Sequence, residues 1–183
     1  MLARVVLQQA DMQRALTRIS HEILETTRGG DDVVLLGIPT RGVLLAERLA
    51  RALEGLTPEP VPVGVLDVTA HRDDLAARPD LSPGVSRLPV DGIDDRTVVL
   101  VDDVLYSGRT IRAALDALAA LGRPRAVRLA VLVDRGHREL PIRADFVGKN
   151  LPTSTEERIN VSLAELDGED CVAIVHAAAG VVS

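Results

Sequence analysis

The chain has 183 residues, 46% of them hydrophobic, so it is long enough and apolar enough to build a full core in one compact domain. This composition excludes an intrinsically disordered chain. The formal net charge of -6 at pH 7 gives no sign of the basic surface that nucleic-acid-binding proteins usually carry.

The N-terminal stretch MLARVVLQQADMQ lacks the charged-then-apolar pattern of a secretion signal. No apolar stretch approaches the roughly 18 residues that a membrane-spanning helix needs. The single cysteine, Cys171, lies in an apolar run and cannot form a disulfide within the chain. We therefore expect a protein of the reducing cytoplasm with no membrane partner.

A first helix is predicted from Asp11, which can cap its N-terminus, to about Thr27, where two glycines follow. At about 100° per residue, one face of this helix is apolar and the opposite face is polar and partly basic. The apolar face carries Met12, Ala15, Leu16, Ile19 and Ile23, and the polar face carries Arg14, Thr17, His21 and Arg28. We expect the apolar face to pack on the core.

The next segment, VVLLGI (33–38), has no polar alternation, which is typical of a strand covered on both faces. The turn PTRG follows and leads into a predicted helix at 43–53. Residues 60–68 form another predicted strand. Residues 69–92 contain three prolines, two glycines and mixed charge, and a long segment of this kind in a compact domain is typically a functional flap.

The central segment TVVLV (97–101) is a predicted buried strand that leads into a helix at 110–122, with Gly122 placed to end it. The remaining predicted elements are a buried strand at 126–133, a charged loop at 134–145, and strands at 158–166 and 171–176. Because βα units follow one another, we predict a single α/β domain with a mostly parallel twisted sheet flanked by helices.

Three turns follow predicted strands: PTRG (39–42), DDVLYSGRT (102–110) and DRGHR (134–138). Ligands of doubly wound sheets bind beyond the carboxyl ends of the strands. We therefore expect the three turns to converge on one crevice.

The middle turn combines two kinds of binding group. Ser107 to Thr110 immediately precede a helix, so their backbone N–H groups and hydroxyls favour a phosphate. Asp102 and Asp103 would repel a phosphate, but ionised carboxylates accept hydrogen bonds from sugar hydroxyls. The combination predicts a ribose 5-phosphate.

Other interpretations of this turn fit less well. The GxxxxGK[ST] pattern of nucleotide-triphosphate loops and the GxGxxG pattern of dinucleotide folds are both missing. A phospho-acceptor domain of the response-regulator type would place its acidic pair at the end of the first strand, whereas this pair ends a later one. A capped helix beside chance acids is the remaining structural alternative.

An apolar run, two aspartates and a small-residue turn ending in threonine resemble the phosphoribosyl-pyrophosphate (PRPP) signature of type I phosphoribosyltransferases. The signature covers Asp102, Asp103, Val104, Leu105, Tyr106, Ser107, Gly108, Arg109 and Thr110. Thr40, Arg41 and Gly42 resemble the diphosphate loop of the same family, in which backbone amides and an arginine hold the leaving group. This resemblance implies a type I fold with a small hood and a flexible flap.

Further motifs point to one family within this fold: GIPTRG, RDDL, PTS and above all DRGHRELPIRADFVGKN. They resemble the PyrR family, whose members are bifunctional pyrimidine-operon regulators and uracil phosphoribosyltransferases. The resemblance extends over about residues 10–175. It implies conversion of uracil and PRPP to UMP and diphosphate, with Mg²⁺ bound mainly through PRPP and no assigned protein ligand. Arg72 and Asp73 would lie in the flap. Asp134 and Arg135 either recognise the base or form a simple loop ion pair.

The sequence departs from the family at one point in the flap. Ala70 and His71 stand where the family usually has a Leu-Tyr pair before RDD. The closing contact of the flap is expected to differ, and catalytic efficiency would be affected more than PRPP binding.

The same resemblance implies binding to the leader of a pyrimidine-operon mRNA, tightened by uridine nucleotides such as UMP or UTP. The matching positions are Thr17, His21, Arg138, Arg143 and Lys149. Few aromatic residues are available to stack on bases, so RNA would bind through arginines and backbone shape on a local patch, enlarged in a homodimer or higher homo-oligomer. A regulator that senses UMP without turnover and an enzyme for another base, such as a purine, stay open as alternatives.

Overall fold

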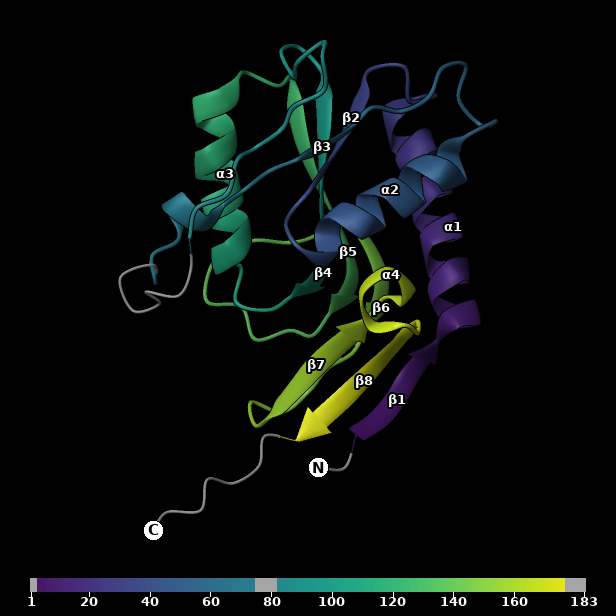
Figure 1. The fold of residues 1–183 in the computed structure, drawn as a ribbon, viewed down its shortest axis with the longest axis vertical. Coiled ribbons are helices and arrows are strands. Elements are labelled where there is room, and N and C mark those ends of the chain that lie inside the picture. Colours follow the sequence, from purple (N-terminus) through teal and green to yellow (C-terminus); the bar gives the residue numbers. More distant parts are fainter. Residues whose placement is uncertain (1–2, 75–81, 177–183) are drawn as a thin grey trace.

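The computed structural model describes residues 3–74 and 82–176, in two sheets with four α-helices and one short 3₁₀ helix in those ranges (Figure 1). The strands are β1 (Ala3–Gln8), β2 (Val33–Gly37), β3 (Val63–Val65), β4 (Thr97–Leu105), β5 (Ala126–Asp134), β6 (Phe146–Asn150), β7 (Glu157–Ser162) and β8 (Cys171–His176). The helices are α1 (Gln9–Thr27), α2 (Arg41–Leu53), α3 (Arg109–Leu121), α4 (Ala164–Asp167) and the 3₁₀ helix η1 (Thr69–His71).

The five-stranded sheet is parallel throughout, in the order β3-β2-β4-β5-β6. One face packs against α1 and α2 and the other against α3, so its central strands are buried on both sides, as their unbroken apolar runs predict. The prediction of a mostly parallel sheet flanked by helices is confirmed.

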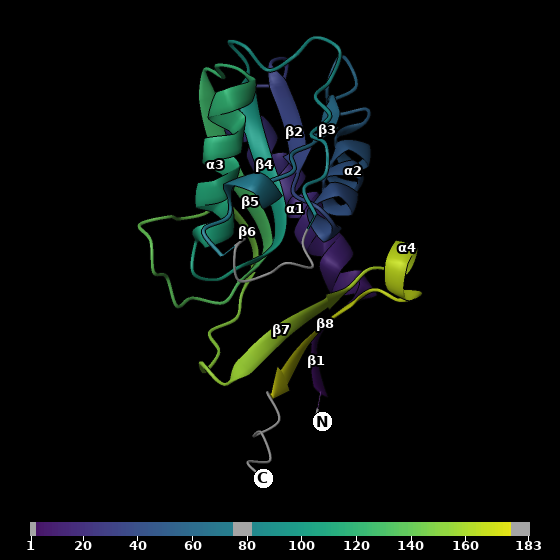
Figure 2. The ribbon, with the colours of Figure 1, turned by 60° about the vertical axis from the view of Figure 1, so that its left-hand side comes forward.

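The smaller sheet is antiparallel in the order β1-β8-β7, and we call this sheet, together with α4 and the rest of the segment between β7 and β8, the hood. Figures 1 and 2 show it beyond one end of the five-stranded sheet. That end carries the carboxyl termini of the parallel strands, because Arg135, which follows β5, donates to the carbonyl of Glu157 at the start of β7. The hood therefore faces the edge at which the crevice is expected.

The first helix starts earlier than predicted. It begins at Gln9, and Asp11 is not its N-cap but lies in its first turn, where it accepts the backbone N–H of Gln8 at 2.9 Å. The predicted apolar face is buried, and Thr17 and His21 are exposed on the polar face, as expected. Gly122 ends α3 as predicted.

Several strand predictions are corrected. The predicted strand at 60–68 is reduced to Val63–Val65, and the one at 158–166 ends at Ser162, where the chain turns into α4. Strand β4 continues through both aspartates to Leu105 instead of ending at Val101. Strands β1 and β6 were not predicted. The centre of the predicted flap, residues 75–81, lies outside the described residues.

Candidate active site

The predicted phosphate turn forms one wall of a cavity of about 330 Å³ at the carboxyl end of β4. Gly108 is the N-cap of α3 with a φ of 93°, a left-handed conformation that glycine adopts without steric cost. The turn lines the cavity with residues 104–111, and the opposite wall comes from Arg72, Asp73, Asp74 and Glu139. The cavity thus lies at the N-terminus of α3, where backbone N–H groups and the helix dipole favour an anion.

Asp102 lines the same cavity and is 8% exposed. Burial, followed by the neighbouring Asp103 carboxylate, raises the pKa of Asp102 well above the ordinary value. The Oδ1 of Asp102 accepts the backbone N–H of Asp103 at 2.9 Å, and the Oδ1 of Asp103 accepts that of Val104 at 2.8 Å. Asp103 is half-buried and is not among the residues that line the cavity, so the two carboxylates are not equivalent.

The predicted diphosphate loop lies against the same strand. Thr40 is the N-cap of α2, and Arg41 and Gly42 form its first turn. A Cβ atom on Gly42 would lie closer to the carbonyl oxygen of Val101 than the 3.0 Å that real Cβ atoms keep. Glycine therefore lets the start of α2 approach the backbone just before Asp102, and the structure brings two of the three predicted turns together.

The described flap residues contact the phosphate turn. Arg109 Nη1 lies 2.5 Å from a carboxylate oxygen of Asp73, and its Nε lies 2.6 Å from one of Glu139. Arg72 forms two hydrogen bonds with Asp74, at 2.7 and 2.8 Å. Hydrogen bonding to Asp74 raises the pKa of Arg72, with smaller contributions from Asp73 and Asp102. The predicted flap and phosphate residues are thus in direct contact.

The charged loop at 134–145 packs on the same turn. The carbonyl of Ser107 accepts backbone N–H groups from Glu139 at 2.9 Å and Leu140 at 3.2 Å. Arg138 forms an ion pair with Asp134 and donates to the carbonyls of Tyr106 and Ile142, each at 2.8 Å. The third predicted turn therefore joins the crevice.

Arg135 has mainly structural contacts. It is 6% exposed, it donates to the side chain of Thr153 at 3.0 Å, and it donates to the carbonyls of Ser154 and Glu157 at 3.1 and 2.8 Å. Its guanidinium also lies 4.1 Å from the centre of the Tyr106 ring. These contacts join the crevice to the start of β7 in the hood.

The predicted RNA-binding residues fall into separate places. Arg18 Nη2 donates to the carbonyls of Val147 and Gly148 at 3.0 and 2.7 Å, so α1 lies along β6, and Thr17, His21 and Lys149 come from these two elements. Arg143 instead lines a shallow cavity beside α3 on the other face of the sheet. Arg138 lies inside the charged loop, so the chain does not gather the five residues on one surface.

Two site residues, Glu139 and Asp167, were not predicted. Glu139 belongs to the charged loop that carried the family resemblance, but nothing in the sequence indicated that it contacts Arg109. Asp167 accepts Nη2 of Arg41 at 3.1 Å through both carboxylate oxygens. The acidic run ELDGED (165–170) was the available signal, because its carboxylates need cationic partners somewhere in the fold.

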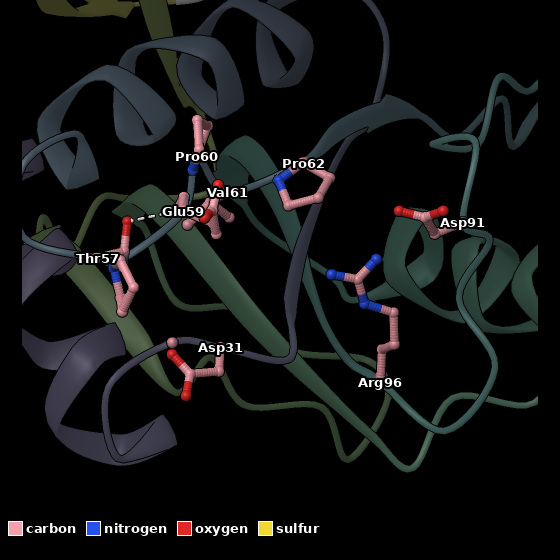
Figure 3. A pocket seen from close by; sticks show the side chains of 10 residues that line it. Asp31, Thr57, Glu59, Pro60, Val61, Pro62, Asp91 and Arg96 are labelled. Atoms are coloured by element: carbon pink, nitrogen blue, oxygen red, sulfur yellow. Dashed lines mark hydrogen bonds between the residues drawn. The ribbon is translucent and has the colours of Figure 1, made fainter.

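A second cavity, of about 510 Å³, lies at the opposite end of the sheet (Figure 3). It is lined by residues that immediately precede β2, β3 and β4, such as Asp31, Pro62 and Arg96. It therefore lies at the amino ends of the parallel strands, away from the three turns, and the smaller cavity is the better candidate for chemistry.

Within residues 3–74 and 82–176, no group of three or more His, Cys, Asp or Glu side chains is arranged to hold a metal ion. None of the helices described in those ranges is both long and apolar enough to cross a bilayer.

The comparisons with known proteins identify the domain family and the fold. The phosphoribosyl transferase domain family matches residues 5–166, so the chain is a phosphoribosyltransferase-domain protein. The fold resembles that of a hypoxanthine-guanine phosphoribosyltransferase from Bacillus anthracis, with a TM-score of 0.72 over 94% of this chain and 98% of that one. At 18% identity, that likeness concerns the fold alone.

Similarity in sequence is much higher to proteins named "Bifunctional protein PyrR". The one from Leifsonia xyli is 66% identical over 179 residues, covering 95% of this chain and 97% of its own. The one from Streptomyces coelicolor is 66% identical over 170 residues, covering 93% and 88%. The chain belongs to the PyrR family, as its motifs predicted.

Proposed function

We propose that the protein transfers the phosphoribosyl group of PRPP to uracil, giving UMP and diphosphate, and that it also binds pyrimidine-operon mRNA in response to uridine nucleotides. The observation that carries the first activity is the cavity in which a helix start, a glycine turn and a buried aspartate converge. Membership of the PyrR family supports uracil as the base and mRNA as the second partner.

In this reaction the bond from ribose C1 to the diphosphate oxygen breaks, a bond from C1 to uracil N1 forms, and the proton on N1 is lost. Positive charge develops on the sugar as diphosphate leaves, so the enzyme must hold the leaving group and exclude water. The turn at Ser107 to Thr110 would hold the 5-phosphate, and Asp102 would accept a ribose hydroxyl. Thr40 to Gly42 would bind the diphosphate, and Arg72 and Asp73 would cover it.

Mg²⁺ fits the donors that line the crevice. This ion prefers oxygen ligands and is commonly bound through one or two carboxylates together with substrate phosphates. Asp73, Asp74 and Asp102 supply carboxylate oxygens in the lining of the cavity. Its chemical contribution would be to neutralise charge on the departing diphosphate.

Diphosphate release with uracil, hypoxanthine and orotate tests the enzymatic half. We expect turnover with uracil alone, and turnover only with hypoxanthine would replace it with a purine activity. UMP binding by calorimetry without turnover on any base would leave a nucleotide sensor.

Gel-shift titration with a pyrimidine-operon leader RNA tests the regulatory half. His21→Ala and Lys149→Ala should weaken UMP-enhanced binding, because both residues lie on the surface formed by α1 and β6. Losing the Lys149 charge should lower the dependence of log affinity on log salt by about 1. Arg87→Ala is the control, since Arg87 is an exposed arginine bridged to β3 at the other edge of the sheet. Equal effects of Lys149→Ala and Arg87→Ala would contradict a specific RNA surface there.

A further inference from the structure

The arginine of the diphosphate loop is held by the hood. Arg41 Nη2 lies 3.1 Å from each carboxylate oxygen of Asp167, at the end of α4. The two side chains are 32% and 31% exposed, so the contact is open to water on one side. The residues are 126 positions apart in the sequence, and the contact spans from the hood to the start of α2.

The guanidinium of Arg41 is incompletely satisfied in this arrangement. Its Nε is buried and has no hydrogen-bond partner among the described residues. A buried donor without a partner loses its hydration without compensation, so the present orientation of the guanidinium carries a free-energy cost. A ligand that offers several oxygens to the same side chain would relieve that cost.

A diphosphate is such a ligand. It carries more negative charge and more acceptor oxygens than a single carboxylate, and arginine binds phosphate oxygens in a planar, two-pronged geometry. An ion pair that is partly exposed is weak, because water screens it. Diphosphate can therefore displace a carboxylate from Arg41 at small cost.

We propose that Asp167 is a positioning residue of the diphosphate site, which holds Arg41 against the hood and competes with diphosphate for its guanidinium. The inference rests on the proposed function, because it needs Arg41 to bind diphosphate. Asp167 thereby sets how tightly the free protein binds PRPP, and the hood takes part in binding the leaving group.

The rest of the interface lets this one contact open. Arg48, seven residues after Arg41 in the same helix, donates to Glu165 at 2.5 and 3.0 Å and to Asp170 at 2.7 and 2.9 Å. Those contacts keep α2 against the hood when Arg41 leaves. Asp167 also accepts the backbone N–H of Leu163 at 2.8 Å, which fixes its carboxylate independently of Arg41.

Calorimetric titration of the full chain with inorganic diphosphate and Mg²⁺ tests the proposal without depending on any base. Asp167→Asn keeps an oxygen for the Leu163 N–H but removes the charge, so it should bind diphosphate roughly twofold to fivefold tighter. KM for PRPP should fall by a similar factor with kcat little changed. Glu169→Gln is the matched control, an exposed acid of the same acidic run without an ion pair among the described residues, and should bind like the wild type.

Arg41→Ala distinguishes a failure of the role of Asp167 from a failure of the diphosphate loop. If Arg41→Ala weakens diphosphate binding and Asp167→Asn then adds nothing in that background, the competition is supported. If Arg41→Ala weakens binding but Asp167→Asn alone binds equally or more weakly, the role of Asp167 is overturned while the diphosphate loop stands. If Arg41→Ala binds diphosphate like the wild type, the assignment of the loop itself fails.

Discussion

Asp102 shows how an unfavourable residue can be kept at a binding site. The side chain is 8% exposed, and burial together with the Asp103 carboxylate raises its pKa, so the fold favours its protonated form. Its contribution to folding stability is fully present below the ordinary pKa of 3.8 and is lost as pH rises through the raised pKa of the folded state. At neutral pH the carboxylate therefore destabilises the free protein, which suits a group that must hold a ligand.

Replacing Asp102 with Asn should separate stability from activity. The variant should be at least as stable as the wild type at pH 8, and the two should converge towards pH 3, below the ordinary pKa of 3.8, where Asp102 is protonated in the folded and the unfolded chain. Turnover should fall about 100-fold or more, because the ribose is no longer held in its reactive orientation. The double variant Asp102→Asn, Asp103→Asn should have no measurable turnover and keep its fold.

Urea denaturation at both pH values, together with diphosphate release, measures these effects. Asp116→Asn is the control, since Asp116 is a half-exposed acid of α3 with a surface ion pair. A large loss of stability with activity retained would show that Asp102 is structural.

The sequence predicts the role of a residue when that role depends on its neighbours in the chain. It does not predict a role that depends on contacts with residues far away in the chain. The acidic pair and the turn behind it could be interpreted because adjacent residues determine their chemistry. Asp134 and Arg135 could not, because the choice between base recognition and an ion pair depends on distant partners. In the structure Asp134 pairs with Arg138, while Arg135 contacts Thr153, so base recognition stays untested.

At the scale of elements, the predicted helices and strands were found where burial determines the spacing of apolar residues in the sequence. Strands covered on both faces and helices with one apolar face were found, because their residues report burial directly. Strand β6 (Phe146–Asn150) was missed because it is short and lies at the edge of the sheet, where pairing with β5 stabilises it more than its own sequence does. Strand β1 was missed because its partner, β8, lies at the far end of the chain.

The close approach of α2 to β4 at Gly42 can be tested by substitution. Gly42→Ala would push its Cβ into the carbonyl of Val101, so the start of α2 must move away from β4. We expect a loss of stability of about 1–3 kcal/mol, as for other overpacked sites, and a raised KM for PRPP because the diphosphate loop is displaced. Urea denaturation and steady-state kinetics measure both. Unchanged kinetics despite the lost stability would mean that the loop does not bind substrate.

At the scale of the whole molecule, the hood and the parallel sheet are joined by side chains from the charged loop and from α2. Arg135 joins the charged loop to β7, and Arg48 joins α2 to the segment before β8. The Arg48 and Asp170 side chains are only 13% and 8% exposed, so this ion pair is well shielded from water. The Arg48 ion pair is therefore a main attachment of the hood to α2, the helix that begins with the diphosphate loop.

Replacing Arg48 with Met tests that attachment. Hydrogen bonds from Arg48 are the largest cause of the lowered pKa values of Glu165 and Asp170. Their stabilising effect is therefore present above the ordinary values of 4.5 and 3.8 and is lost as pH falls. At pH 7 the variant should lose roughly 3 kcal/mol, because Asp170 is left buried without its partner. Below about pH 4 the difference from the wild type should start to shrink, and it should vanish only below the lowered pKa values that the two acids have in the folded wild type.

Denaturation curves between pH 3 and pH 7 measure the effect, and Arg51→Met provides the control from the same helix. Arg51 is 63% exposed and lies 3.8 Å from Glu165, so its loss should change stability by less than about 1 kcal/mol at any pH. If Arg48→Met and Arg51→Met have similar small effects, the hood is held by its apolar contacts and not by the ion pairs. A hood held in that way would leave Arg41 and Asp167 free to separate without help from Arg48.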